Sequence, residues 1–264
     1  MSVLRSVKAW RNRKLEARTY PYLFVDARYK KVRIDGRVVS QGVLIVSGVR
    51  DDGYREILAV EVADTESEST YHELFRSLKR RGLSGMELVV SDDHEGFNAA
   101  VARHFQGASW QRCQVHYARN LLGMVGHASR KELAADLKAI FAAPAREQAL
   151  QSASSTAEKW RKKKANEKVA EHIEECLSCL SFPESHRQRI RTTNGLERLN
   201  QEIKRRTRVV RIFPNRQACL RLVRALAVEQ SEEWVTGRRY LNMEELRELS
   251  FRECESKEVL AIER

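Results

Sequence analysis

The sequence predicts an α/β protein built around a layered sheet, and three observations lead to that prediction. Strand-like segments separated by turn residues fill residues 20–62, which indicates an antiparallel meander. Helical and strand-like segments then alternate from residue 67 onward. The stretch 129–184 shows no strand pattern and is expected to be helical. Such an order is typical of a mixed sheet that is covered by helices.

The predicted first strand contains Leu23, Phe24 and Val25 and ends at Asp26. The chain then stays extended over residues 30–33 and reaches Asp35-Gly36, a dipeptide that favours a hairpin turn. We expect the return strand at 38–49 and a third strand at 54–62. In the third strand, alternation predicts that Ile57, Ala59 and Glu61 face one side of the sheet and Leu58, Val60 and Val62 the other.

The alternating segments follow in the same way. Ser67 can cap a helix that Gly82 ends, and residues 86–90 are short, apolar and β-branched, which predicts a buried strand. A helix at 95–105, an extended segment at 108–113 and a helix that opens near Gln114 come next. Ser91-Asp92-Asp93-His94 lies at the C-terminal end of the predicted strand at 86–90.

Two further helices are predicted late in the chain. Leu196, Leu199 and Ile203 recur at helical spacing, and Asn194 can cap the start of that helix. Pro214 interrupts the chain, and residues 215–233 are predicted to form another helix.

Composition points to a polyanionic partner. The 264 residues carry a formal net charge of +12, and 42% of them are hydrophobic, which is ordinary for a packed core. Nucleic acid is favoured over an anionic membrane surface. No apolar run approaches the roughly 20 residues that span a bilayer, and residues 1–20 lack a signal-peptide core, so we expect a cytoplasmic protein. Five cysteines at irregular spacing predict reduced thiols rather than a disulfide framework.

Three carboxylates are the candidate chemical groups. Asp26 and Asp92 follow predicted strands, and Glu197 lies on the predicted late helix. If the first and fourth strands are neighbours, the two aspartates stand side by side at one edge of the sheet. Carboxylate oxygens suit Mg²⁺ or Mn²⁺, and a pair of such ions supports in-line phosphoryl chemistry.

The helix that carries Glu197 lies in the most basic part of the sequence. Residues 187–211 contain nine Lys or Arg against two Glu. Cationic side chains on one helix suit the phosphate backbone of DNA, although not all of them can face one way. The candidates for phosphate contact are Arg198, Lys204, Arg205, Arg206, Arg208 and Arg211.

Four blocks of sequence resemble the Mutator-type family of insertion-sequence transposases. They are Leu-Phe-Val-Asp-Ala-Arg-Tyr around Asp26, Val-Val-Ser-Asp-Asp-His-Glu-Gly around Asp92, Arg-Cys-Gln-Val-His ending at His116, and Arg-Thr-Thr-Asn-Gly-Leu-Glu-Arg-Leu-Asn-Gln-Glu-Ile-Lys-Arg-Arg-Thr-Arg-Val-Val starting at Arg191. The resemblance runs from about Tyr20 to about Leu241. Its last block is long and therefore specific.

The resemblance implies a DDE catalytic core of ribonuclease-H-like fold, with a helical insertion before the glutamate. Asp26, Asp92 and Glu197 would then be the catalytic and metal-binding triad, and Cys113 with His116 the C-x-x-H signature. The implied enzyme is a polynucleotidyl transferase that uses Mg²⁺ or Mn²⁺, as two ions, to cleave and transfer DNA strands. Its partners would be double-stranded DNA, as element ends and target, and further copies of itself on that DNA, with no membrane.

The implied organisation divides the chain into four parts. Residues 1–19 are the remnant of an N-terminal linker, 20–128 the first part of the core, 129–186 the insertion, and 187–264 the remainder of the core with C-terminal helices. Transposases of this type carry a long N-terminal region thought to recognise terminal repeats. Only about 20 residues precede the first strand here, so we expect a fragment, a decayed copy or an isolated core.

Alternatives remain for several of these residues. Asp93 can replace Asp92 as a ligand, and Glu202 can replace Glu197, although a surface pairing of Glu202 with Arg198 or Arg206 also explains it.

The histidine and cysteine residues have two interpretations each. Cys113 and His116 alone cannot complete a four-ligand zinc site. One interpretation is structural: a buried thiol and a capped histidine near a helix start. The other is functional: His116 donates to an oxygen of the reacting phosphate or supports Asp92 as a neighbouring ligand partner. The spacing of His172, Cys176, Cys179 and His186 could hold zinc, but a single C-x-x-C is weak support.

Two other functions fit the same residues. One is a metal nuclease of the same fold that stops after hydrolysis. The other is a truncated DNA-binding remnant without catalytic activity.

Overall fold

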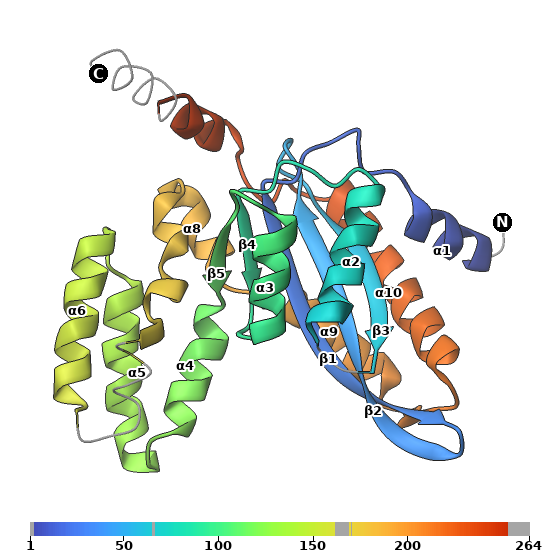
Figure 1. The fold of residues 1–264 in the computed structure, drawn as a ribbon, viewed down its shortest axis with the longest axis horizontal. Coiled ribbons are helices and arrows are strands. Elements are labelled where there is room, and N and C mark those ends of the chain that lie inside the picture. Colours follow the sequence, from blue (N-terminus) through green and yellow to red (C-terminus); the bar gives the residue numbers. More distant parts are fainter. Residues whose placement is uncertain (1–2, 65–66, 162–168, 170, 253–264) are drawn as a thin grey trace.

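A mixed sheet of six strands lies at the centre of the computed structural model, which describes residues 3–64, 67–161, 169 and 171–252 (Figure 1). The strands are β1 (Tyr22–Ile34), β2 (Arg37–Val49), β3 (Arg55–Ala63), β4 (Leu88–Ser91), β5 (Ser109–Arg112) and β6 (Ile212–Phe213). Their order is β3-β2-β1-β4-β5, with β6 beside β1. The first three strands are antiparallel, whereas β4 pairs parallel with both β1 and β5. The predicted α/β class with a mixed sheet is confirmed.

The first hairpin forms at the predicted turn. Asp35 and Gly36 have φ angles of 47° and 77°, which is the left-handed backbone that a two-residue hairpin turn requires. The prediction that the first strand ends at Asp26 is wrong, because β1 continues to Ile34. The reason is that β2 pairs with β1 along its whole length, so the backbone groups beyond Asp26 remain hydrogen-bonded in the ladder.

The sides predicted for the third strand are partly wrong. Val46 pairs with Ala59 and Ser47 pairs with Ile57, so Leu58 is an extra residue in β3, a bulge. Ile57 therefore packs on the same side as Val60 and Val62, while Leu58 and Ala59 belong to the core on the other side. Strict alternation in the sequence cannot indicate where such a residue is inserted.

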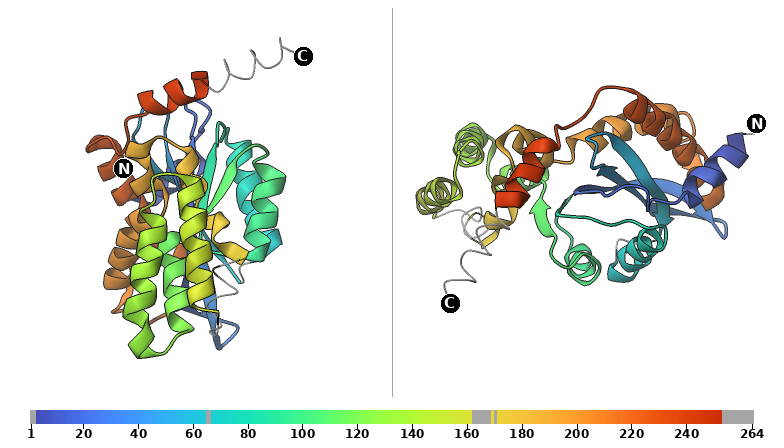
Figure 2. Two further views of the ribbon diagram at one scale, coloured as in Figure 1. Left: turned by 90° about the vertical axis from the view of Figure 1, so that its left-hand side faces the viewer. Right: turned by 90° about the horizontal axis from the view of Figure 1, so that it is seen from above.

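Helices α2 (Glu68–Arg80) and α3 (Glu95–His104) cover one face of the sheet (Figures 1 and 2). The Ser67 hydroxyl accepts a hydrogen bond from the backbone N–H of Thr70 at 3.4 Å, which confirms the predicted cap of α2. The core of this face includes Leu74, Phe75 and Phe97 from the helices.

The other face of the sheet is covered by α9 (Asn194–Thr207) and α10 (Arg216–Thr236) (Figure 2). The buried residues of α9 include the predicted Leu196, Leu199 and Ile203. Asn194 does not cap this helix as predicted, because Thr193 occupies the cap position and Asn194 is the first helical residue. Helix α1 (Val3–Asn12) lies against α10.

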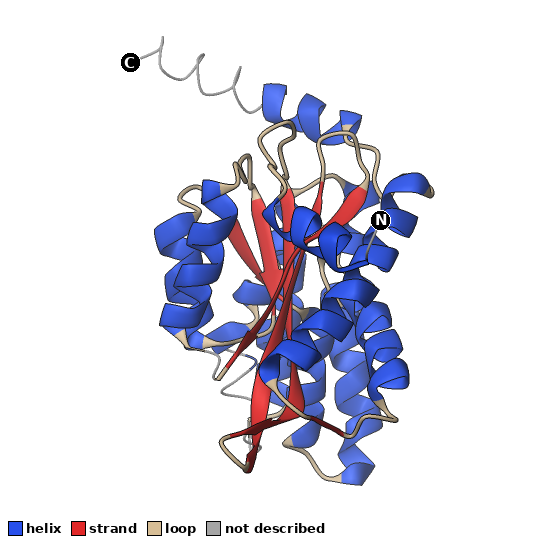
Figure 3. Cartoon of the chain, turned by 90° about the vertical axis from the view of Figure 1, so that its right-hand side faces the viewer, coloured by secondary structure: helices blue, strands red, loops and turns tan. Residues whose placement is uncertain are grey.

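A helical lobe follows β5 and lies beside the sheet (Figure 1). Figure 3 shows the strands of the sheet between the helices. It contains α4 (Gln114–Gly123), α5 (His127–Phe141), α6 (Arg146–Lys159), the 3-10 turns η1 (Glu174–Cys176) and η2 (Ser178–Ser181), and α8 (Glu184–Ile190). The buried Gln111 side chain connects the lobe to β5, since it donates to the Cys176 carbonyl at 2.8 Å and accepts from the Cys179 N–H at 2.7 Å. No strand occurs in the described part of the stretch that was expected to be helical.

Within the described chain, Cys113, Cys176, Cys179 and Cys219 are free and buried, in line with the expectation of reduced thiols. Cys254 lies outside the described residues, as does the rest of 253–264. None of the described helices combines the length and the apolar character needed to cross a membrane.

A buried histidine holds the segment after α10 against the sheet. His186 is fully buried, and its two ring nitrogens lie 2.8 Å from the Tyr22 hydroxyl and 2.6 Å from the Asn242 carbonyl. Because a carbonyl only accepts, Nε2 must carry the proton that bonds Asn242, which leaves Nδ1 to accept from Tyr22. Burial lowers the pKa of His186, because it disfavours the charged ring.

We expect stability to fall as the pH is lowered through the region where His186 protonates. The folded chain binds this proton less readily than the unfolded chain, so the His186 contribution is complete above the ordinary histidine pKa of 6.5 and decreases below it. Urea unfolding of wild type and His186→Gln over a pH series measures this effect. The pH dependence should weaken in His186→Gln but not in His127→Gln, which changes an exposed histidine; equal pH profiles for the three proteins would contradict the assignment.

Candidate active site

The parallel pairing of β1 with β4 places Asp26 and Asp92 next to each other. The last paired residues are Phe24 and Val90, and each aspartate comes two residues later in the chain: Asp26 within β1 and Asp92 directly after the end of β4. Phe24 and Val90 both contact the core on the face of α9. Side chains two residues apart on a strand point to the same face, so Asp26 lies on the same face as Phe24. Asp92 follows Val90 by the same two residues, just beyond the end of β4.

Helix α9 brings Glu197 to the same place. Its buried stripe packs on the face of the sheet from which Asp26 projects, and Glu197 lies beside that stripe with a side chain that is 21% exposed. Glu197 Oε1 is 3.7 Å from His116 Nε2 and 3.5 Å from a guanidinium nitrogen of Arg119. Three elements far apart in the sequence thus bring their carboxylates toward one point.

His116 lies between two of these carboxylates. Its Nε2 faces Glu197, and its Nδ1 is 4.0 Å from Asp92 Oδ2. Hydrogen bonding to Cys113 raises the pKa of His116, and the negative charges of Asp92 and Asp26 act in the same direction, against the effect of burial. The imidazole is therefore disposed to carry a positive charge among the acids.

Cys113 is held in place at the start of α4. Its sulfur accepts from the Thr193 backbone N–H at 3.4 Å and from the Thr193 hydroxyl at 3.5 Å. Burial alone would raise the pKa of this thiol, but the hydrogen bonds from His116 and Thr193 outweigh it, so that the pKa is lowered. Cys113 thus connects His116 on α4 to the residue that precedes α9.

Asp26 is the most enclosed of the three carboxylates, with 8% of its surface exposed. Its Oδ2 accepts a hydrogen bond from the side-chain amide of Asn200, which is 2% exposed and lies one turn after Glu197 on α9. Burial raises the pKa of the Asp26 carboxyl, while the charge of His116 opposes this effect. The Asn200 amide therefore attaches α9 to the first aspartate.

The two alternative acids have other partners. Asp93 pairs at 2.8 Å with Arg112, which also pairs with Glu175. Glu202 pairs with Arg205 and Arg206 at 2.7 and 2.6 Å, and these arginines lower the pKa of Glu202 to about 2. The predicted pairing of Glu202 with Arg206 is confirmed, and none with Arg198 is found in the described chain. Both alternative acids are thus engaged by arginines.

The six predicted phosphate-contact residues are all exposed, but they differ in their partners. Arg205 and Arg206 share Glu202, and Arg206 is also 3.4 Å from Glu229, which reduces the charge they can offer to a ligand. Arg198, Lys204, Arg208 and Arg211 have no ion pair in the described parts of the chain.

The described residues contain no group of three or more His, Cys, Asp or Glu that could hold a metal ion as the side chains are placed. The sequence-based zinc possibility has its residues engaged elsewhere, since His186 bonds Tyr22 and Asn242, and His172 is 3.1 Å from Glu175. At Asp26 the donor chemistry nevertheless suits a hard cation, because Asn200 Oδ1 is a buried oxygen with no hydrogen-bond partner.

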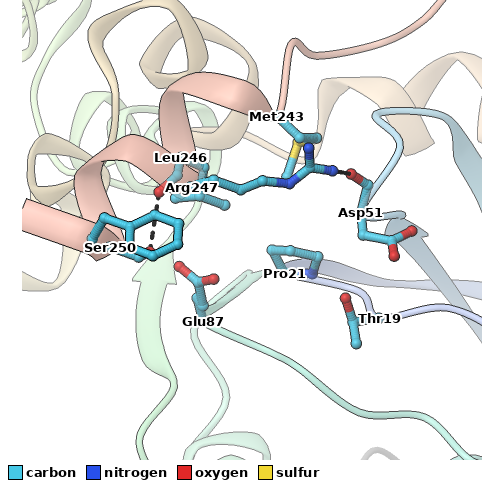
Figure 4. A pocket seen from close by; sticks show the side chains of 9 residues that line it. Thr19, Pro21, Asp51, Glu87, Met243, Leu246, Arg247 and Ser250 are labelled. Atoms are coloured by element: carbon cyan, nitrogen blue, oxygen red, sulfur yellow. Dashed lines mark hydrogen bonds between the residues drawn. The ribbon is translucent and has the colours of Figure 1, made fainter. Parts of the chain in front are cut away.

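Two cavities lie next to the sheet. One of about 200 Å³ opens beside the aspartates, and its lining includes Asp26, Ser91, Asp92, Asp93 and His94. The other, of about 330 Å³, lies where β1 begins and is lined by Glu87, Met243, Leu246 and other residues (Figure 4). Arg247 closes one side of the second cavity by donating to the Asp51 carbonyl at 2.7 Å. Only the first cavity includes any of the three carboxylates.

Sequence reasoning missed three residues of this region: Asn200, Arg119 and Arg112. Asn200 lies in the same helical stripe as the buried Leu196 and Ile203, so a polar residue at a core position was an available signal. Arg119 is exposed, and its closeness to Glu197 depends on how α4 and α9 pack, which has no local signal.

The chain belongs to the Mutator family of transposases. The sequence model described as "Transposase, Mutator family" matches residues 1–237. This class of protein was implied by the four sequence blocks, and the resemblance is confirmed.

Individual relatives are transposases of bacterial insertion sequences. The chain is 46% identical over 245 residues to the transposase for insertion sequence element ISRM5 of Rhizobium meliloti, a match that covers 92% of this chain and 61% of that protein. It is 37% identical over 243 residues to the transposase for insertion sequence element IS256 in transposon Tn4001 of Staphylococcus aureus, with 90% and 62% covered. The chain therefore spans about three fifths of the length of these relatives.

A solved structure, described as the Drosophila P element transposase strand transfer complex, aligns with a TM-score of 0.28 and 10% identity. The alignment covers 84% of this chain and 67% of that one. A similarity of this size carries no argument about fold or function.

We expect Asn200→Ala to destabilise the protein through Asp26. The substitution leaves a buried carboxylate without its amide donor, which costs about 1–3 kcal/mol. Urea unfolding of Asn200→Ala, of Asp26→Ala and of the double variant forms a cycle that isolates the coupling between the two residues. The loss should be smaller when Asp26 is already absent. Gln201→Ala, on the exposed side of α9, is the matched control; an equal cost of Asn200→Ala in both backgrounds would exclude the coupling.

Proposed function

We propose that this chain is the catalytic core of an insertion-sequence transposase, which cleaves DNA strands and joins the freed ends to target DNA. The observation that carries the proposal is that Asp92 and Glu197 lie on either side of His116, while Asp26 accepts a hydrogen bond from Asn200 on the helix that carries Glu197. Membership of the Mutator transposase family supports it. In this proposal the three carboxylates are the DDE triad.

We further propose that the core has the ribonuclease-H-like fold, with the helical lobe as an insertion between β5 and α9. The antiparallel β1–β2–β3 meander, the parallel β4 and β5 and the helices on both faces support this proposal. The position of the lobe between the second and third carboxylates in the chain also supports it.

Mg²⁺ or Mn²⁺, as two ions, is the proposed cofactor. Asp26, Asp92 and Glu197 would hold the ions, because carboxylate oxygens are hard ligands that suit these cations. When bound, such ions supply charge that activates an attacking oxygen and stabilises the leaving oxygen. The buried, unpaired Asn200 Oδ1 beside Asp26 supports a cation near this position.

The proposed reaction has two steps, and side chains next to the carboxylates can donate hydrogen bonds to the reacting phosphate. Hydrolysis breaks a phosphorus–oxygen bond and leaves a 3′-hydroxyl at a DNA end. That hydroxyl oxygen then attacks a phosphorus of target DNA, forms a new phosphodiester bond and displaces another 3′-hydroxyl. His116, whose pKa is raised, can donate a hydrogen bond to a phosphate oxygen, as can the exposed Arg119 beside Glu197.

DNA and further copies of the protein are the proposed partners of the complete transposase. Because the chain spans about three fifths of the relatives, recognition of element ends and assembly of copies on DNA are assigned here only to the complete transposase. For this chain we propose binding to double-stranded DNA through its cationic surface, including Arg198, Lys204, Arg208 and Arg211.

We expect Asp26→Asn and Glu197→Gln each to reduce DNA cleavage by roughly 100-fold or more, because each change removes a charge from the proposed cation site. Labelled duplex DNA incubated with purified protein and Mn²⁺, resolved on a denaturing gel, measures cleavage, and pre-cut ends in the same assay measure strand transfer. Asp35→Asn is the matched control, since Asp35 is an exposed turn residue with a left-handed backbone that asparagine tolerates.

The outcomes separate the alternatives. Cleavage that persists in Asp26→Asn would remove the catalytic assignment. Cleavage without strand transfer from pre-cut ends would indicate a nuclease. DNA binding without any cleavage by wild type would indicate a non-catalytic remnant.

A further inference from the structure

An aromatic and arginine cluster lies at the start of α9, on the side away from His116. The guanidinium of Arg55, at the beginning of β3, lies 3.5 Å from the ring centroid of Trp234 and 4.5 Å from that of Tyr240. The guanidinium of Arg189 lies 5.2 Å from the same Tyr240 ring. Two cations therefore contact a single aromatic side chain, and the fold brings them there from β3 and α8.

The cations of this cluster have no acidic partner in the described part of the chain. Among the described residues, Arg55, Arg189 and Arg198 form no ion pair with an acid, although many other arginines do. Arg55 Nε is buried and has no hydrogen-bond partner. Burial lowers the pKa of Arg55 to about 10. The Tyr240 hydroxyl, which is hydrogen-bonded to the guanidinium, opposes this effect on the pKa, and the positive charges of Arg198 and Arg189 add to it.

The start of α9 adds further positive charge at the same place. A Cβ atom at position 195 would overlap the Nη1 atom of Arg55, so the guanidinium packs directly against Gly195 in the first turn of the helix. The first N–H groups of a helix carry partial positive charge. In α9 the Asn194 N–H donates to the Thr192 hydroxyl at 3.4 Å, and the Leu196 and Glu197 N–H groups donate to the Thr193 carbonyl. Thr193, at the cap position, provides no side-chain hydrogen bond to them, because its hydroxyl donates to Cys113.

Such an arrangement is unfavourable without an anion. Like charges repel, and a partly buried guanidinium with an unpaired N–H loses the hydrogen bonds that water would provide. A phosphate offsets the repulsion between the guanidinium groups, because arginine donates to its oxygens in a planar, two-pronged geometry. Arg189 and Arg198 are exposed, so an anion can reach the cluster from solvent.

We propose that Arg55, Arg189 and Arg198 bind a phosphate of the DNA backbone close to the phosphate that meets the carboxylates. The proposal deepens the proposed function and rests on it for the identity of the ligand as DNA. Arg198 directly follows Glu197 on α9. A single DNA strand can therefore contact the carboxylates on one side of this helix and the arginines on the neighbouring side. The cluster then fixes the position of the strand relative to Glu197.

DNA binding at several salt concentrations tests the proposal. We expect Arg189→Gln and Arg198→Gln each to weaken binding of a fluorescently labelled duplex by about tenfold. Each should also reduce the slope of log affinity against log salt by about one, because one phosphate contact is lost. Arg103→Gln is the matched control, since Arg103 is an exposed arginine on α3, which covers the opposite face of the sheet. Affinities within twofold of the control, together with unchanged salt slopes, for Arg189→Gln and Arg198→Gln would overturn the proposal.

Arg55 is tested separately because it also packs against Trp234. Arg55→Gln removes the charge, whereas Arg55→Lys keeps it without the planar donor fork, and circular dichroism with thermal unfolding shows whether each variant folds. We expect a loss of salt slope in folded Arg55→Gln and a smaller one in Arg55→Lys. Unchanged slopes in both folded variants would remove Arg55 from the site.

Inorganic phosphate provides a readout that does not involve DNA. We expect phosphate to raise the thermal unfolding midpoint of wild type more than that of the Arg189→Gln/Arg198→Gln double variant, whose unfolding in chloride gives its own reference. An equal phosphate effect in both proteins would count against an anion site at this cluster.

These measurements are independent of the proposed catalysis. Binding is measured with a chelator present, so a wild-type chain that fails to cleave DNA in Mn²⁺ refutes the catalytic proposal alone. A chain that cleaves normally but shows no change in binding on substitution of the cluster refutes the phosphate site alone.

Discussion

The parallel pairing of β1 with β4 is the constraint on which the rest of the site depends. Asp26 and Asp92 come two residues after the paired Phe24 and Val90, so their closeness follows from one register. A shift of β4 by one residue would turn Asp92 away from α9 and present Asp93 instead. The salt bridge between Asp93 and Arg112 opposes such a shift, and buried side chains on both faces of β4 oppose it further.

Charge in the region around α9 is divided between its sides. Glu197 lies on the side of α9 that faces α4, close to Asp26 and Asp92. His116 and Arg119 partly balance the negative charge of these carboxylates. The beginning of the helix lies against Arg55, which has no acidic partner in the described chain. Further along, Glu202 neutralises its arginine neighbours. The net charge of +12 is therefore distributed unevenly, and counting basic residues does not reveal which of them are available to a phosphate.

Asn200 shows how packing and chemistry are joined in this fold. A polar side chain in the buried stripe of α9 would be unfavourable without a partner, and the Asp26 carboxylate is that partner. The same bond holds the helix that carries Glu197 against the strand that carries Asp26. A change in the packing of α9 would therefore alter the spacing of the carboxylates, even if it occurred far from them along the helix.

Much of the element order could be predicted from the sequence, because the period of apolar residues and the turn residues are local properties of the chain. The hairpin at Asp35-Gly36, the cap at Ser67 and the apolar stripe of α9 are examples, and local sequence blocks also indicated the three acids. The bulge at Leu58, the continuation of β1 past Asp26 and the partners of Asn200 and Arg55 were decided only by the tertiary structure. Asn200 and Asp26 are 174 residues apart, and contacts over such a separation are set by how whole elements pack, which no local pattern records.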